Sequence, residues 1–499
     1  MAGSSRDRWR DVHRGAGLLA GVALFVILFS GTWSLAQESM AGWWRRAALS
    51  DSAGVPPLNR LIGAASALGF DLRDARITLP RPADPAVRFR AAHTPRSLRL
   101  DPATGQVVIT GAARGKWLVT LHKTLFAGFP GRIVVSLWGI VLLLLVIAGI
   151  VLHRRRWPDA ARIRYGRGRH LLLFDLHAFV GLWSLPWLVL FGFTGAFSGL
   201  GALGTVALAS AVFPGHPRQA FAELTGPPPP AATQVAWRHP PDVESILRLD
   251  AQRSPGFRPE IVTLHHWGDA AASVEIAGIT SGLASTVLFE RHLYRAADGF
   301  PLARRTARGR GFWLRAFVAM QPLHFARYGW VPHIASELRA LHFLTAVGAC
   351  GLCVSGLCLR ARRRQGRSGG WRARGLAASV TGVCGGLVLA AGLSLLAGRL
   401  LPAGARCDVL LQRLPWYVWG GSVACAWLAP RRLPVGRCLS AAGGAAYLLA
   451  GLLHLFVTVR DTGHPYFWNV DAVLVAGGGV LLALAIRPPR DAPVRAATR

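Results

Sequence analysis

The sequence is poor in charged residues, and poorest in acidic ones. Aspartate and glutamate total 24 against 57 lysines and arginines, and only 16% of the 499 residues are charged while 52% are hydrophobic. This composition excludes an ordinary soluble domain. All seven cysteines lie from position 350 onward. Their lone CxxC, Cys350–Cys353, falls inside an apolar run, so neither a disulfide framework nor a zinc site is indicated.

Long apolar runs repeat along the chain and predict a mainly α-helical integral membrane protein with about eight transmembrane helices. The first run is long and lacks a small-residue cleavage site, so we interpret it as a retained helix and not as a signal peptide. The predicted spans cover residues 15–36, 132–152, 178–200, 338–359, 376–400, 414–429, 438–458 and 467–486.

Arginine placement predicts the orientation of these helices. If eight helices alternate, every arginine cluster falls on one side of the membrane, and the positive-inside rule places both termini of a multi-pass membrane protein in the cytoplasm. The net charge of +33 is spread over these loops, so it indicates contact with membrane lipid and no nucleic-acid binding. The clusters run from Arg6 to Arg14, Arg154 to Arg169, Arg360 to Arg374, Arg431 to Arg437 and Arg487 to Arg499.

Two long segments, 37–120 and 201–330, are left on the opposite, periplasmic side. The first contains alternating strands around a turn at Asp101–Gly105, and the second contains strands around a turn at Asp298–Gly299. Both are expected to be small α+β units in which a helix packs on an antiparallel sheet. Neither carries a nucleophile with a base or a pair of carboxylates, so we predict binding or scaffolding there and assign no catalytic residue.

One histidine–glycine pattern occurs twice, with glycine at four and eighteen residues after the histidine. Eighteen residues make five helical turns, so each histidine and its distal glycine are expected on one helix face. A histidine at the start of a spanning helix, above a face kept clear by glycine, suits a flat macrocycle. The alternative is that the glycines are helix-packing seams and the histidines are interfacial. The copies are His13, Gly17 and Gly31, then His177, Gly181 and Gly195.

The helices that re-enter the membrane after each insertion match as well. One begins with LHKTLFAG around His122 and closes at Gly149, and the other begins with LHFARYGW around His324 and closes at Gly356. The second copy has extra residues between its histidine and its glycine. The first four helices therefore form a tandem duplication, with one histidine pair expected at each membrane face.

A pair of neutral imidazoles fills both axial positions of a heme iron, which favours electron transfer over oxygen binding. Four such histidines predict two hemes b stacked across the membrane. Interfacial histidines that only face water are the alternative. His342 lies inside the fourth helix and is a weaker candidate ligand, because its counterpart in the first copy is Val135. His265 and His266 could touch a substrate or metal, or belong to an ordinary strand.

These four motifs, in this order, resemble the PepSY-associated transmembrane helix family over about residues 8–364. The DPATGQVV segment resembles the end of a PepSY domain. Members are linked to iron acquisition, and some are inner-membrane di-heme reductases of ferric siderophores. The resemblance implies that His13, His122, His177 and His324 are the heme ligands.

The expected organisation is a first membrane repeat plus third helix at 8–200 with a PepSY-like insertion at 37–120, a second insertion at 201–330, a fourth helix at 331–364 and a C-terminal four-helix region at 375–490. The expected function is transfer of electrons outward to a ferric siderophore or other ferric chelate. No Rossmann fingerprint is present, so a quinol or a flavoprotein must donate the electrons. The alternative is a non-enzymatic module that binds or regulates an envelope protein or protease.

Overall fold

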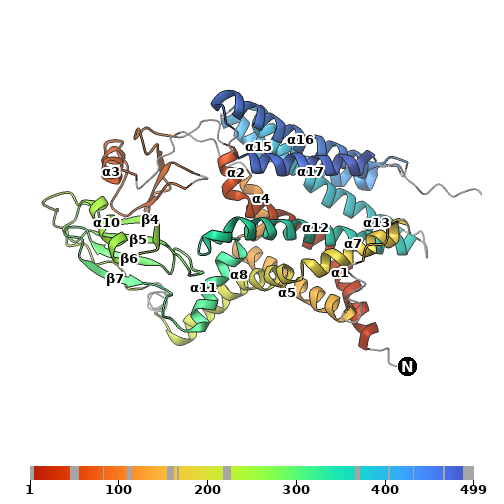
Figure 1. Cartoon of the computed structure of the whole chain (residues 1–499), viewed down its shortest axis with the longest axis horizontal. Coiled ribbons are helices and arrows are strands. Elements are labelled where there is room, and N and C mark those ends of the chain that lie inside the picture. Colours follow the sequence, from red (N-terminus) through yellow and green to blue (C-terminus); the bar gives the residue numbers. More distant parts are fainter. Residues whose placement is uncertain are drawn as a thin grey trace, which may run out of the picture.

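The computed structural model describes residues 5–44, 56–81, 84–108, 115–153, 162–165, 168–216, 226–365, 371–402, 405–430, 432–464 and 467–486. An elongated helical region makes up one part, and a lobe built on an antiparallel sheet lies at one end of it (Figure 1). The N-terminus lies at the end away from the sheet lobe. The mainly α membrane fold with small α+β insertions is therefore confirmed.

The spanning helices of the duplicated core pack as antiparallel neighbours. Thr32 of the first helix meets Cys350, and its Gly21 meets Leu357, so the first and fourth spans pass side by side in opposite directions. The core elements are α1 (Ser5–Leu35), α2 (Gln37–Trp43), α4 (Lys116–Thr124), α5 (Gly128–His153), α7 (Arg169–Trp183), α8 (Leu185–Val212), α11 (Phe312–His324), the 3-10 turn η1 (Pro332–Ile334) and α12 (Ala335–Gln365).

The third predicted span differs from the expectation of one continuous helix. The chain breaks at Ser184, between α7 and α8, because Pro186 in the first turn of α8 has no backbone N–H to continue the helical ladder. His177 therefore lies on α7 and Gly195 on α8, whereas His13 and Gly31 share the unbroken α1. The argument from five helical turns holds for the first copy only.

The C-terminal region was predicted to contain four transmembrane helices. Among its described residues, three helices are long and apolar enough to cross a membrane. Together with α1, α5, α8 and α12 these make seven such helices among the described residues. The sixth predicted span, 414–429, is the exception: it lies in a helix, Ala405–Leu428, whose first half carries Asp408 and Arg413 and which is not among the seven. The elements are α13 (Trp371–Ser379), the π-turn η2 (Val380–Gly385), α14 (Gly386–Leu400), α15 (Ala405–Leu428), α16 (Val435–Thr462) and α17 (Trp468–Ile486).

Close glycine contacts pack α15 antiparallel to α13 and α14. Gly375 faces Trp427, and Gly386 faces Ser422, so α15 runs back along the preceding helices. Its second half therefore packs against the preceding helices, but the transmembrane span predicted for residues 414–429 is not among the seven helices apolar enough to cross a membrane.

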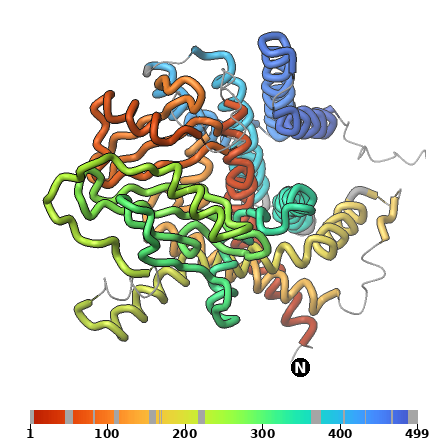
Figure 2. The backbone as a smooth tube through the Cα atoms, turned by 60° about the vertical axis from the view of Figure 1, so that its left-hand side comes forward, coloured from red at the N-terminus to blue at the C-terminus, as the bar shows by residue number. Residues whose placement is uncertain are grey.

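Strands from both insertions form a single seven-stranded sheet with the order β3-β2-β1-β4-β5-β6-β7. The first insertion supplies β3, β2 and β1, and the second supplies the other four strands. The two parts join where β1 pairs antiparallel with β4 through Ile77 and Val262 (Figure 2). Sequence analysis predicted two separate units and missed this pairing. The strands are β1 (Ala75–Thr78), β2 (Val87–Ala91), β3 (Ser97–Leu100), β4 (Phe257–His265), β5 (Ser273–Thr280), β6 (Arg291–Arg295) and β7 (Pro301–Arg305).

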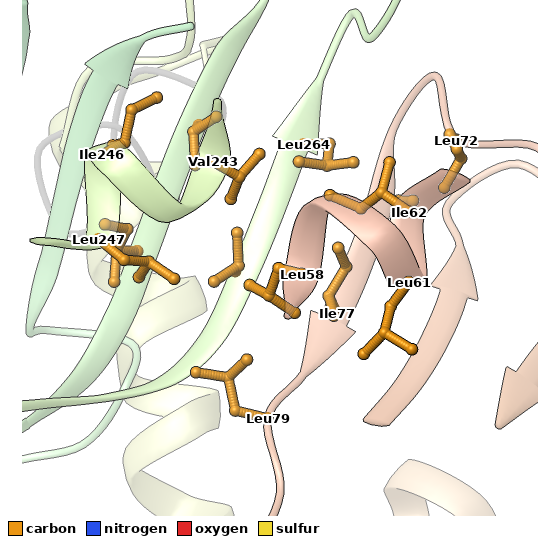
Figure 3. Packing of buried hydrophobic residues seen from close by; sticks show 14 of the residues in the cluster. Leu58, Leu61, Ile62, Leu72, Ile77, Leu79, Val243, Ile246, Leu247 and Leu264 are labelled. Atoms are coloured by element: carbon orange, nitrogen blue, oxygen red, sulfur yellow. The ribbon is translucent and has the colours of Figure 1, made fainter. Parts of the chain in front are cut away.

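One hydrophobic core unites the two insertions. Apolar side chains of α3 (Leu58–Ala67) and α10 (Val243–Arg253) pack together with inward-facing strand residues such as Ile77 and Leu264 (Figure 3). Strand β2 shows the expected alternation, with Val87, Phe89 and Ala91 buried between exposed arginines.

A polar contact also ties α3 to α10. Asn59 Nδ2 donates to Asp242 Oδ1 at 2.7 Å, and the Val243 N–H donates to Asn59 Oδ1 at 3.0 Å. Asp242 is the N-cap of α10. Hydrogen bonds from Ser245 and Asn59 lower the pKa of Asp242 to about 2. The two insertions therefore form one lobe, held together by a single sheet, a common hydrophobic core and the contact of Asn59 with the N-cap of α10.

Candidate functional site

The four histidines of the duplicated motifs come together as two pairs. The rings of His13 and His177 have centroids 6.4 Å apart and are nearly perpendicular, at 84°. The rings of His122 and His324 have centroids 6.0 Å apart and are nearly parallel, at 15°. The first pair, here called the inner pair, lies toward the N-terminal end of α1. The second, the outer pair, lies toward the sheet lobe.

Each histidine of the inner pair is anchored by its Nδ1 to the facing helix of its own repeat. His13 Nδ1 donates to the carbonyl of Leu145 on α5 at 3.1 Å. His177 Nδ1 contacts Ser355 Oγ on α12 at 2.8 Å. Because the Ser355 hydroxyl donates to the Leu352 carbonyl at 3.1 Å, its oxygen is left to accept from His177.

The outer pair repeats this arrangement. His122 Nδ1 donates to the carbonyl of Ile27 on α1 at 2.9 Å. His324 Nδ1 contacts Thr194 Oγ1 on α8 at 2.8 Å, and that hydroxyl donates to the Leu190 carbonyl at 2.5 Å. Thr194 therefore accepts from His324, just as Ser355 accepts from His177.

These four bonds assign one tautomer to all four rings. At His13 and His122 the partner is a carbonyl, which can only accept, so Nδ1 carries the proton. At His177 and His324 we assign the same tautomer, because each hydroxyl then donates to its own helix and accepts from the ring, and each Nε2 keeps its lone pair. A ring nitrogen lies about 2 Å from a metal that it binds and about 1 Å from its own centroid, so two imidazoles on opposite sides of one metal have centroids about 6 Å apart. Both pairs are at this separation.

Sequence analysis missed Thr194 and Ser355. Each directly precedes a glycine of the duplicated pattern, Gly195 or Gly356, and that position was the available signal. A hydroxyl in an apolar helix commonly bonds its own backbone. Only the tertiary arrangement turns these two hydroxyls toward an imidazole.

The motif glycines lie against the histidine rings. A Cβ at Gly31 would lie 2.8 Å from His122 Cε1, and one at Gly195 would lie 3.7 Å from His324 Cε1. The closing glycines face the inner pair in the same way. There a Cβ at Gly149 would lie 3.8 Å from His13 Cε1, and one at Gly356 would lie 3.3 Å from His177 Cε1.

Different glycines form the helix-packing seam. Gly139 and Gly199 bring α5 and α8 close enough that a Cβ at either would meet backbone atoms of the other helix. By contrast, a Cβ at Gly17 would meet only Leu145, and one at Gly181 only Leu352, each at 3.8 Å. Both glycines line the cavity at the inner pair. The duplicated glycines therefore leave room at the histidines, while the packing role falls elsewhere.

His122 and His324 differ from the sequence prediction in their immediate setting. They lie on the short helices α4 and α11 and not at the start of the spans α5 and α12. Left-handed residues turn the chain after each, at Leu125 and Phe126 in the first repeat and at Ala326 in the second. The longer second connection, which includes η1, holds the extra residues of that copy.

Two cavities open at the two pairs. The outer cavity has a volume of about 530 Å³ and is lined by His122, His324 and His342, together with Thr286 and Phe289 of the sheet lobe. The inner cavity has a volume of about 1090 Å³ and is lined by His13 and His177. Both are also lined by Leu24, Leu28 and Leu142, so they meet end to end across a layer of leucines.

Basic side chains line both cavities. Lys123 and Arg132 line the outer one. At the inner cavity Asp175 accepts hydrogen bonds from the Arg164 side chain and backbone, which fixes Arg164 in the cavity lining. The inner cavity is lined by Arg6, Arg10, Arg14, Arg162, Arg164 and Arg360. Arg154–Arg156, Arg367, Arg431 and the arginines of the tail lie outside the described residues.

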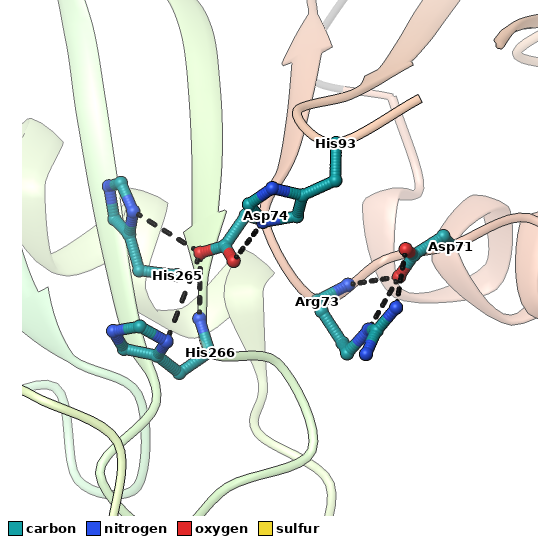
Figure 4. Close-up of polar contacts among 6 residues, drawn as sticks. All are labelled: Asp71, Arg73, Asp74, His93, His265 and His266. Carbon is teal, nitrogen blue, oxygen red and sulfur yellow. Dashed lines mark hydrogen bonds and ion pairs between the residues drawn. The ribbon is translucent and has the colours of Figure 1, made fainter. Parts of the chain in front are cut away.

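His265 and His266 lie at the junction of the two insertions and not near either histidine pair. Asp74 accepts a bond from His93 Nε2 at 2.9 Å and lies 3.9 Å from His265 Nδ1 and 4.0 Å from His266 Nδ1 (Figure 4). Burial alone would raise the pKa of Asp74, but the His93 bond and the His266 backbone N–H leave it lowered. Within the described ranges, no group of three or more histidine, cysteine or acidic side chains is arranged to hold a metal ion.

The fold and the paired histidines define a class, a multi-pass membrane protein with a duplicated four-span core and an extramembrane sheet lobe. The model of the PepSY-associated TM region matches residues 10–363, and the chain belongs to this family. It is also similar to an uncharacterized protein of Pseudomonas aeruginosa, with 50% identity over 376 residues that cover 75% of this chain and 95% of the relative.

The close contact at Gly31 predicts different responses from two equivalent glycines. Gly31→Ala places a methyl group 2.8 Å from His122, so the ring must move, whereas Gly195→Ala meets His324 at an ordinary 3.7 Å. We expect Gly31→Ala to cost about 1–3 kcal/mol in stability, the usual cost of overpacking, and Gly195→Ala to cost much less. Thermal unfolding of the two purified variants in detergent measures this. Equal melting temperatures would contradict the assigned packing.

Proposed function

We propose that each histidine pair holds one heme b, so that the protein is a di-heme electron carrier across the membrane. The observation that carries this proposal is the shared geometry of the pairs. All four rings have an anchored Nδ1 and a free Nε2 lone pair, and both pairs are separated by the distance expected for two imidazoles on one metal. This supports the ligand assignment made from the four motifs.

The surroundings fit a flat, apolar group with carboxylates at its edge. The glycines beside the rings have no side chain that would fill the cavities. Leucines and aromatic residues such as Trp138 and Phe191 line the outer cavity. Lys123, Arg132 and the arginines of the inner cavity supply cations for the carboxylates. A heme bound by two histidines supplies one-electron transfer at an iron with no open position.

The chain itself would fix the ligands and exclude water. The anchors hold each imidazole in the tautomer that binds a metal, and the leucine layer separates the two sites without a polar group. His122 bonds the carbonyl of Ile27 and faces Gly31, which follow His13 on α1 by fourteen and eighteen residues, so the two sites lie about 21–27 Å apart, within the thickness of the hydrocarbon core. An electron path from one face to the other follows.

The proposed substrate is a ferric siderophore or another ferric chelate, reduced at the outer pair. The sheet lobe contributes Thr286, Leu288 and Phe289 to the rim of the outer cavity, so a large molecule docked on the lobe lies close to the outer site. Outer-sphere reduction needs no positioned acid or base. The basic residues of the outer segments, among them Lys116, Arg304, Arg305 and Arg315, would attract anionic chelates in a salt-dependent way.

The proposed location is the bacterial inner membrane, with both termini in the cytoplasm, the sheet lobe in the periplasm, and a quinol or a flavoprotein as electron donor. The arginine clusters support this orientation. Reporter fusions after Thr104 and Ala232 should be active only for an enzyme that requires the periplasm. Activity of a cytoplasm-dependent reporter at either position would overturn the orientation.

Removing one histidine should remove one heme. His13→Ala or His177→Ala should lower the heme content from two to about one per chain by loss at the inner site, and His122→Ala or His324→Ala should do so at the outer site, because each iron would lose an axial ligand. Heme extraction and reduced-minus-oxidised spectra measure this. Unchanged heme content in all four variants would refute the ligand assignment.

A spectrum also separates this proposal from the non-enzymatic alternative, in which the sheet lobe binds an envelope protein or protease and the helices are anchors. Purified protein should show a Soret band, and dithionite-reduced protein mixed anaerobically with ferric siderophores should be reoxidised while a colorimetric chelator traps iron(II). A Soret band without reoxidation faster than the buffer blank would leave an electron carrier with another acceptor. Absence of the band would favour the alternative.

A further inference from the structure

His342 is a third imidazole at the outer cavity, and it belongs to neither pair. It lies on α12, is fully buried, and contacts the Phe191 ring at a tilt of 51°, with centroids 4.9 Å apart. The Tyr328 hydroxyl is 2.9 Å from its Nδ1. Its Nε2 is buried and has no hydrogen-bond partner within the described part of the chain. A buried polar atom without a partner is costly unless a bound group satisfies it.

The Tyr328 contact indicates which ring nitrogen carries the proton. If Nδ1–H donated to the tyrosine oxygen, the buried phenol proton would lack an acceptor as well. If the phenol donates to Nδ1 instead, Tyr328 is satisfied and a single N–H, at Nε2, is left. His342 lines the outer cavity and Tyr328, which is bonded at Nδ1, does not. We therefore infer that the opposite edge of the ring, which carries Nε2, faces the cavity.

The first repeat has no counterpart of the His342 side chain. The equivalent position in the first repeat is Val135, which also lines the outer cavity. His122 and His324 already form an anchored pair with lone pairs at Nε2, whereas the inferred tautomer of His342 has a proton there. A protonated Nε2 donates a hydrogen bond and does not bind iron.

We propose that His342 is a positioning residue that donates a hydrogen bond from Nε2 to the group held between His122 and His324, and thereby raises the reduction potential of the outer site. The inference rests on the proposed hemes, whose carboxylates are acceptors of this kind. An N–H dipole with its positive end toward the site disfavours the more positive, oxidised state, so loss of the donor should lower the potential.

The test is a spectroelectrochemical titration of the full-length protein with both hemes bound. His342→Val, which gives the second repeat the residue of the first, should keep two hemes and shift one midpoint potential to a more negative value. His342→Gln keeps an N–H donor and should restore part of the shift. Thr345→Val is the matched control, since this buried hydroxyl bonds only carbonyls of its own helix, and it should leave both potentials unchanged.

Two results would overturn the inference while the hemes themselves stand. One is an unchanged pair of potentials in His342→Val. The other is loss of one heme in His342→Val but not in His324→Ala, which would make His342 the axial ligand. Tyr328→Phe provides a second variant if His342→Val folds poorly. It should shift the same potential, because without the tyrosine hydroxyl the proton of His342 is no longer held on Nε2. Wild-type protein without heme would instead refute the proposed function.

Discussion

The hydrogen bond from Nδ1 of each paired histidine to the facing helix is the interaction on which the site depends. An imidazole on a membrane helix has two nitrogens to satisfy where water is scarce. Here His13 and His122 donate to backbone carbonyls, and His177 and His324 donate to hydroxyls whose own protons are already used. The rings are thereby fixed in position, and their second nitrogens are left available to a ligand.

The duplication explains how two similar sites arise from one plan. The anchoring bonds all form within a repeat, between its outgoing and returning helices. The pairs, by contrast, form between repeats, since His13 meets His177 and His122 meets His324. Neither repeat alone builds a pair. The same division is seen in the sheet lobe, where β1 of the first insertion pairs with β4 of the second.

The C-terminal helices lie beyond the residues that match the family. They join the core through a hydrophobic cluster that includes Phe25, Leu387 and Leu474, and through a buried polar cluster. Trp43 Nε1 of α2 donates to Asp471 at 2.7 Å, and His454 Nδ1 lies 2.9 Å from the same carboxylate. His454 also stacks on the Trp43 ring, with centroids 4.8 Å apart. An acidic group buried among membrane helices must be paired, so this cluster specifies how the C-terminal unit docks.

The sequence by itself determined the helical membrane class and the duplication, because apolar length and repeat spacing are local properties. From the duplication it predicted one histidine pair at each face, and the structure brings His13 to His177 and His122 to His324. The break at Ser184 was missed although its signal, Pro186, is local. The sequence did not determine the single sheet or the anchors Thr194 and Ser355. Those depend on which surfaces meet across a hundred or more residues. A hydroxyl or a strand edge has many possible partners along a chain, and only the packed structure selects one.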